Sequence, residues 1–203
     1  MSQSVNQELI EFLDNSPTCF QAVENFRKML KDAGYSELLE CEKWEIVPGG
    51  KYFVTRNDSS IIAFSVPKKD FTGFQLICSH TDSPSFKIKE NAEMDADGKY
   101  TKLNVEGYGG MLCAPWFDRP LSVAGRIAVR TENGIETRLV NLDQDLAMIP
   151  NLAIHMNREA NSGYKYNIQK DMLPIVGEAS SKGKLMKLVD ENAGVKEEDI
   201  LST

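Results

Sequence analysis

The sequence FQLICSHTD, residues 74–82, joins an apolar run to the polar triplet His80-Thr81-Asp82. The run predicts a buried strand, and a histidine at the carboxyl end of such a strand lies where open α/β sheets place their chemistry. Asp82 can accept the second ring N–H of His80, which fixes the tautomer and strengthens the ring as a metal ligand. His80 is therefore a candidate metal ligand, and a structural histidine is the alternative interpretation of so short a motif.

The residues that precede this stretch alternate between helical and strand patterns. Residues 16–18, Ser-Pro-Thr, are typical of a helix start, and Gly34 predicts the end of that helix. Residues 51–55 and 60–66 predict two strands that a turn at Asn57-Asp58 joins into a hairpin. The first part of the chain is therefore expected to have an α/β fold.

Beyond residue 89 the pattern becomes richer in strands. Residues 86–89 and 101–105 alternate apolar and polar side chains, as half-exposed strands do. Asn133-Gly134 predicts a tight turn between strands at 123–130 and 135–142. We therefore expect two parts, an α/β domain at residues 1–90 and a β-rich domain at residues 91–203.

The end of the second part has a helical pattern. Residues 184–189 predict a helix that stops at Gly194, and residues 195–201 predict the start of another helix.

Composition argues against several classes of partner and location. The 203 residues carry a net charge of −7 with no basic cluster to offset it, which argues against a nucleic-acid partner. No apolar stretch approaches the roughly 20 residues that span a bilayer, and the first residues lack a signal-peptide core. The four cysteines lie far apart and never form Cys-x-x-Cys, which favours reduced thiols in a cytoplasm.

Three further motifs have both a functional and a structural interpretation. Residues 107–110, Gly-Tyr-Gly-Gly, lack the spacing of a phosphate loop and are typical of a turn. Asp118 is either a metal ligand or the anchor of a loop through a pair with Arg119. His155 lies among apolar residues, so it is either a core imidazole or a functional side chain. A Gly-x-Ser-x-Gly elbow is absent, so a hydrolytic triad is poorly supported.

Several of these stretches occur together and in a fixed order. They are Ser16-Pro17-Thr18, Gly49 to Asn57, His80-Thr81-Asp82-Ser83-Pro84, Tyr108-Gly109-Gly110, Trp116-Phe117-Asp118-Arg119 and Ile149 to His155. The combination resembles the N-terminal half of the M18 metallopeptidases, the aspartyl aminopeptidases. The resemblance runs over nearly the whole chain, and it is far more specific than any single motif.

This resemblance implies a dinuclear zinc aminopeptidase whose α/β catalytic domain carries an inserted β-rich dimerisation domain. It implies a homo-oligomer, built from dimers into a dodecamer, that removes N-terminal Asp or Glu from peptides. His80 then matches the first zinc ligand of the family, and Asp82 matches the catalytic-site carboxylate that orients this ligand. His155 matches a substrate-binding histidine that reaches the site of a neighbouring subunit. Asp118 is assigned a structural role, because the family's bridging aspartate lies in a later motif.

The sequence departs from the family in the donors that a dinuclear centre needs. No histidine follows His155, and Glu197-Glu198 lies in a polar run that is typical of a solvated face. Each zinc takes about three protein ligands, so the isolated chain is expected to bind no zinc tightly and to be inactive. We expect the N-terminal portion of an aspartyl aminopeptidase. The alternative is a truncated, non-catalytic paralogue that acts as an assembly or interaction module.

Overall fold

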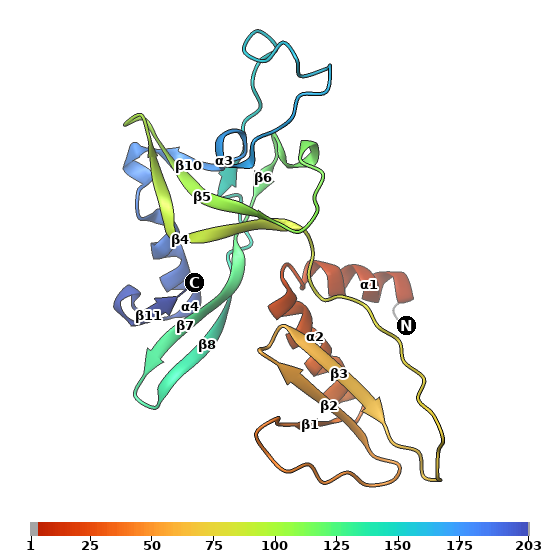
Figure 1. Ribbon diagram of the computed structural model, residues 1–203. Helices are drawn as coiled ribbons and strands as arrows, with labels where there is room; N and C mark the ends of the chain where they lie inside the picture. The colour runs from red at the N-terminus through yellow and green to blue at the C-terminus, as the bar shows by residue number, and fades with distance from the viewer. Residues whose placement is uncertain (1–3, 203) are drawn as a thin grey trace. The chain divides into compact units, whose positions relative to one another are not determined.

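The computed structural model describes residues 4–202, which form two compact units that divide between residues 83 and 84 (Figure 1). The division falls between Ser83 and Pro84, earlier than the expected boundary between residues 90 and 91. The reason is that β4, Ser85–Ala96, is one continuous strand that pairs with β5, Tyr100–Tyr108. The expected boundary would cut this strand in two.

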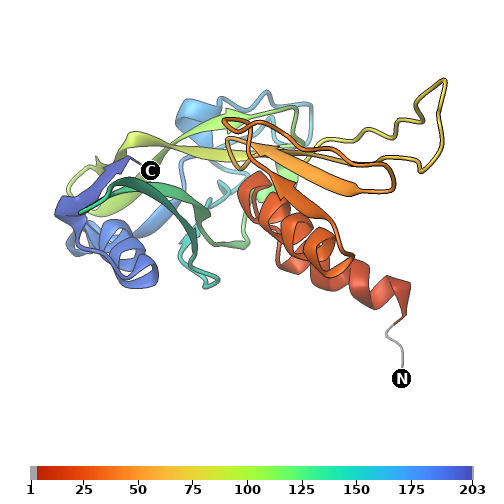
Figure 2. The same ribbon diagram turned by 90° about the horizontal axis from the view of Figure 1, so that it is seen from below.

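The first unit has two helices and a three-stranded sheet in the order β1-β2-β3. Its elements are α1 (Val5–Asp14), α2 (Cys19–Asp32), β1 (Ser36–Leu38), β2 (Lys51–Arg56) and β3 (Ser60–Ser65). Strand β1 pairs with β2 in parallel, and β2 pairs with β3 antiparallel. Helix α2 lies along one face of this sheet (Figures 1 and 2), so the expected α/β arrangement is present.

Local signals explain where these elements begin and end. The Thr18 hydroxyl caps α2 by accepting the backbone N–H of Phe20 at 3.2 Å. Gly34 follows the end of the helix with a φ of +79°, a value that glycine adopts without strain. Asn57 and Asp58 both have positive φ, 53° and 51°, which suits the tight turn of the β2–β3 hairpin. The predicted helix and hairpin are confirmed.

Arg27 on helix α2 pairs with three carboxylates, and the two that lie outside the helix tie it to β1 and to the β2–β3 turn. Its guanidinium lies 2.7 Å from Glu24, 2.9 Å from Glu37 and 2.9 Å from Asp58, with only 20% of the side chain exposed. Burial alone would lower the pKa of Arg27, but the carboxylates outweigh it and raise that pKa. Burial alone would raise the pKa of Glu37, but the hydrogen bonds and positive charges of Lys31 and Arg27 outweigh it and lower that pKa below its usual value.

The second unit contains two sheets. One has five strands in the order β4-β5-β10-β9-β6, and the other has three in the order β11-β7-β8. The remaining strands are β6 (Pro120–Leu121), β7 (Ala124–Thr131), β8 (Gly134–Asn141), β9 (Ala147–Met148), β10 (Ile175–Glu178) and β11 (Ile200–Ser202). The helical elements are η1 (Ala114–Trp116), α3 (Ile168–Asp171), η2 (Ala179–Ser181), α4 (Lys184–Ala193) and η3 (Glu197–Asp199). The predicted hairpin at Asn133-Gly134 is confirmed as β7–β8.

Helix α4 covers the hydrophobic core of this unit. Its buried residues Leu185 and Val189 join the cluster that includes Val105 and Val129 from the two sheets. The carboxylate of Glu93 accepts the backbone N–H groups of Gly183 at 2.5 Å and Leu185 at 3.1 Å. Glu93 therefore satisfies the amino end of α4 from strand β4.

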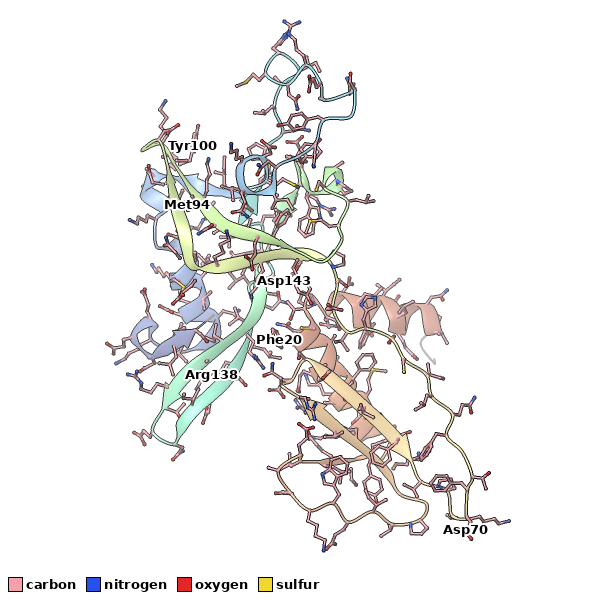
Figure 3. The ribbon with its side chains drawn as sticks, in the orientation of Figure 1. Phe20, Asp70, Met94, Tyr100, Arg138 and Asp143 are labelled. Carbon is pink, nitrogen blue, oxygen red and sulfur yellow. The ribbon has the colours of Figure 1, made fainter. Side chains whose placement is uncertain are left out.

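At the other end of α4, Arg138 from β8 (labelled in Figure 3) donates to the carbonyl of Ala193 at 3.0 Å. A cation at this end of a helix complements its dipole.

The prediction of a helix that starts at residues 195–201 is wrong. Residues 197–199 form a single 3₁₀ turn, and β11 then pairs antiparallel with β7. Ile200 packs against the hydrophobic cluster, and its strand pairs opposite Val129. Partial burial of Ile200 and the pairing with β7 therefore override the polar, helix-like pattern of the preceding residues. None of the helices that the structure describes combines the length and apolar character needed to cross a membrane.

Candidate functional site

The run that leads to His80 is extended but forms no strand. Residues 74–79 pair with no strand in the described part of the chain, and Phe74, Leu76 and Ile77 are 84%, 80% and 94% exposed. The prediction of a buried strand is therefore wrong for this structure. An extended segment buries its side chains only where other segments pair with it or cover it. Asp70 marks the bend at which this segment turns back (Figure 3).

The carboxyl end of the same segment is anchored to the sheet of the first unit. The Thr81 hydroxyl donates to the backbone carbonyl of Ser59, which lies just before β3, at 2.7 Å. This hydrogen bond holds the residue between His80 and Asp82 beside the β2–β3 turn.

His80 and Asp82 form the local pair that their spacing predicts. The His80 Nδ1 atom lies 2.6 Å from the backbone carbonyl oxygen of Asp82 and 3.1 Å from its carboxylate Oδ1. Both partners are acceptors, so Nδ1 carries the proton and donates, and Nε2 keeps its lone pair. The ring is 79% exposed, so it is not a buried structural histidine. This arrangement leaves Nε2 of the exposed ring available, in the tautomer that a metal ligand requires.

A complete zinc centre needs more donors than this pair provides. Within residues 4–202, no group of three or more His, Cys, Asp or Glu side chains is placed to hold a metal ion. A catalytic zinc takes about three protein ligands. The described residues therefore fit one ligand and its orienting carboxylate, and they do not fit a whole centre.

His155 lies in a long loop of the second unit, residues 151–166. The loop contains turns but no strand or α-helix, and in Figure 1 it projects beyond the strands of its unit. The His155 side chain is exposed, as are the neighbouring Leu152, Ile154 and Met156. The interpretation of His155 as a core imidazole is therefore wrong, because its apolar neighbours are themselves turned to solvent.

Asp118 anchors the start of this loop. Its carboxylate Oδ1 accepts the backbone N–H of Asn151 at 2.8 Å, and its own N–H donates to the carbonyl of Ile149 at 2.9 Å. Arg119 donates to the carbonyl of Pro115 at 3.4 Å. The loop is therefore anchored through the backbone of residues 149–151, and this backbone takes the place of the expected pair with Arg119.

The residues at the other end of the loop were not predicted from the sequence. The rings of Phe117 and Tyr166 lie 4.8 Å apart, and Tyr166 meets Tyr164 edge to face at 5.3 Å. The Tyr164 hydroxyl donates to Asp171 at 3.1 Å, and this bond, with burial and nearby negative charge, raises the pKa of Tyr164. The spacing of Tyr164 and Tyr166 was the available signal, because alternate residues of an extended segment share one side.

An exposed imidazole that is hydrogen-bonded to a carboxylate makes this chain a candidate metalloprotein. Comparison with known proteins shows to which family of metalloproteins it belongs. The chain matches the family "Aminopeptidase I zinc metalloprotease (M18)" over residues 12–203. It is 47% identical over 206 residues to a "Probable M18 family aminopeptidase 2" of Clostridium acetobutylicum, covering 96% of this chain and 47% of the relative. It is 50% identical over 179 residues to the protein of the same name from Clostridium novyi, covering 86% and 41%.

A solved structure agrees with these relatives. The cryo-EM structure of the Ape4 and Nbr1 complex matches all of this chain and 45% of that chain, with a TM-score of 0.89 and 33% identity. The chain therefore belongs to the M18 family of zinc metallopeptidases, and its mixed α/β fold is that of the N-terminal portion. It spans less than half the length of the curated relatives that it matches.

Proposed function

We propose that this chain supplies the N-terminal portion of a dinuclear zinc aminopeptidase that removes N-terminal Asp or Glu from peptides in the cytoplasm. The observation that carries the proposal is the His80–Asp82 pair, with Nδ1 held and Nε2 open, in a chain of a zinc peptidase family. The preference for acidic residues rests on the family resemblance alone.

In this proposal His80 contributes one zinc ligand through Nε2, and Asp82 keeps the ring in the required tautomer. The other donors come from polypeptide equivalent to the remaining portion of the relatives. We therefore propose that the chain by itself holds no zinc tightly and does not catalyse. The absence of a three-donor group within residues 4–202 supports this.

The proposed role of His155 is to contact substrate in the site of a second copy of the chain. Its exposure on a projecting loop supports this role, because a side chain on such a loop can reach beyond its own unit. The proposed assembly is a homo-oligomer built from dimers into a dodecamer. Exposed apolar residues, such as Leu152 and Met156 on this loop, offer surface for contacts between copies.

Co-expression tests the proposal. The chain is produced together with the portion of the Clostridium acetobutylicum relative that lies beyond the matched region, and the complex is purified. We expect release of N-terminal aspartate from an Asp-peptide, with about two zinc ions per pair. His80→Ala should lose zinc and activity together, whereas His155→Ala, the matched control, should keep its zinc. Full zinc content in the His80→Ala pair would contradict the proposal, and an inactive, zinc-free complex would favour the assembly module.

A further inference from the structure

We propose that Phe117 and Asp118 form a clamp that closes loop 151–166 at its base and thereby positions His155. The clamp is defined by these two residues, which follow η1 and precede β6. The inference rests on the proposed function in one respect, namely that His155 contacts substrate. The closure of the loop itself depends only on contacts within the second unit.

The clamp holds the amino end of the loop through the backbone. The Asp118 carboxylate accepts the N–H of Asn151 at 2.8 Å, and the Asp118 N–H donates to Ile149 at 2.9 Å. Phe117 and Ile149 also form an isolated parallel bridge. Ile149 is fully buried, so this end of the loop is fixed to the core of the unit. The hydrogen bond to Asn151 is charge-assisted, which places it among the stronger kinds.

The same clamp holds the carboxyl end of the loop through an aromatic contact. The Phe117 ring lies 4.8 Å from that of Tyr166, and both side chains are half-buried. The Tyr166 ring packs edge to face against the ring of Tyr164, whose hydroxyl donates to Asp171 at the end of α3. Asp171 also accepts the backbone N–H of Asn167 at 2.7 Å. Two adjacent residues therefore contact both ends of the loop.

Little else restrains the loop between its ends. Residues 152–163 are exposed apart from the half-buried Asn157, and backbone hydrogen bonds such as those from Met156 and Asn157 to Ala153 form short turns within the segment. Apolar burial is the main force that fixes a segment in place, and this segment has little of it. The position of His155 is therefore set mainly at the base, where closing the ends removes chain entropy.

The backbone of Asp118 allows a sharp test. Its φ is +54°, which glycine and asparagine accept more readily than other residues. Asp118→Gly removes the carboxylate while keeping this conformation. Asp118→Asn keeps an acceptor oxygen and serves as the conservative rescue. Asp97→Gly makes the same change at a φ of +55° in the β4–β5 turn and is the matched control.

Two measurements on the purified chain report on the loop. One is the rate of trypsin cleavage after Arg158 and Lys165, which lie in the loop, and the other is amide hydrogen exchange of residues 152–163. We expect Asp118→Gly to raise both rates about tenfold, the factor for losing one charge-assisted hydrogen bond. Asp97→Gly should stay within about twofold of the parent, and Asp118→Asn, which keeps a neutral acceptor, should lie between the parent and Asp118→Gly. Unchanged exchange in β7 and β8 shows that the unit remains folded.

Phe117→Leu gives a second, independent arm. It removes the ring contact with Tyr166 and should speed cleavage after Lys165 more than cleavage after Arg158. Loop rates that stay at the parent level in both Asp118→Gly and Phe117→Leu, with β7 and β8 still protected, would overturn the clamp.

The failure of the clamp and the failure of the proposed function can be told apart. In the active co-expressed complex, Asp118→Gly should lower kcat/KM, and Asp118→Asn should restore it. Adding His155→Ala to Asp118→Gly should lower kcat/KM only a little further. A loosened loop with unchanged hydrolysis confirms the clamp and refutes the substrate role of His155. A loop of normal rigidity refutes the clamp, whatever the activity.

Discussion

Replacing Asp82 with asparagine tests how His80 is held. The Nδ1 atom of His80 has two acceptors, the Asp82 carbonyl at 2.6 Å and the Asp82 carboxylate at 3.1 Å. The substitution removes only the charge of the more distant acceptor, so the tautomer should persist. Partners of this kind change metal affinity by about 10–100-fold. Because the nearer acceptor, the Asp82 carbonyl, is kept, we expect a loss at the lower limit of this range. Zinc affinity should fall about tenfold, which corresponds to about 1.4 kcal/mol.

Two assays check this expectation. Zinc affinity is measured in the co-expressed complex by competition with a chromophoric chelator, and Asp70→Asn, an exposed change in the same extended segment, is the control. Nitrogen chemical shifts of the imidazole rings report the tautomer in the chain alone, because the sequence has two histidines and His155→Ala assigns them. A loss far above 100-fold would make Asp82 a ligand itself. A proton on Nε2 in the parent chain would refute the geometry.

Four other predictions follow from the same structure. His155→Ala in the co-expressed complex should lower kcat about a hundredfold with zinc content unchanged; loss of zinc would show that its role is wrong. Glu93→Gln should lower the free energy of unfolding by about 1–2 kcal/mol in thermal melts, because an ionised cap of α4 is lost, whereas the exposed Glu90→Gln should change little. The pKa of Glu37 is lowered in the folded state, so its ionised side chain stabilises the fold above the usual pKa of 4.5, and this stabilisation is lost as the pH falls through the folded pKa. The free energy of unfolding of the parent should therefore exceed that of Glu37→Gln by its largest amount at pH 7, and this difference should vanish in acid. The exposed apolar run 74–79 should make the isolated chain self-associate, and a monomer in light scattering over a wide concentration range would count against this.

Features set by neighbouring residues could be predicted from the sequence. Thr18 caps α2 through a group two residues away, and Asn57-Asp58 turns the hairpin by its own backbone preference. The His80–Asp82 pair belongs to the same class, since both groups lie within three residues. Local patterns sufficed for these features because the interacting groups are close in the chain.

Features that depend on distant contacts could not be predicted in this way. The run 74–79 has the composition of a buried strand, but burial requires other segments to pair with it or cover it. Residues 195–201 have a helical pattern in the sequence, but the antiparallel pairing of β11 with β7 overrides it. The bond from Asn151 to Asp118 and the contact of Tyr166 with Phe117 join residues far apart in sequence. No spacing rule reports such contacts, so the clamp emerged only from the structure.

The most direct test of the account is the release of N-terminal aspartate from an Asp-peptide by the purified chain alone. The assay contains added zinc or manganese, and bound metal is counted on the same sample. We predict no hydrolysis and no tightly bound metal, because residues 4–202 contain one imidazole paired with a carboxylate at this site and no group of three donors. Hydrolysis with about two metal ions per chain would contradict it, because these residues would then supply the whole centre.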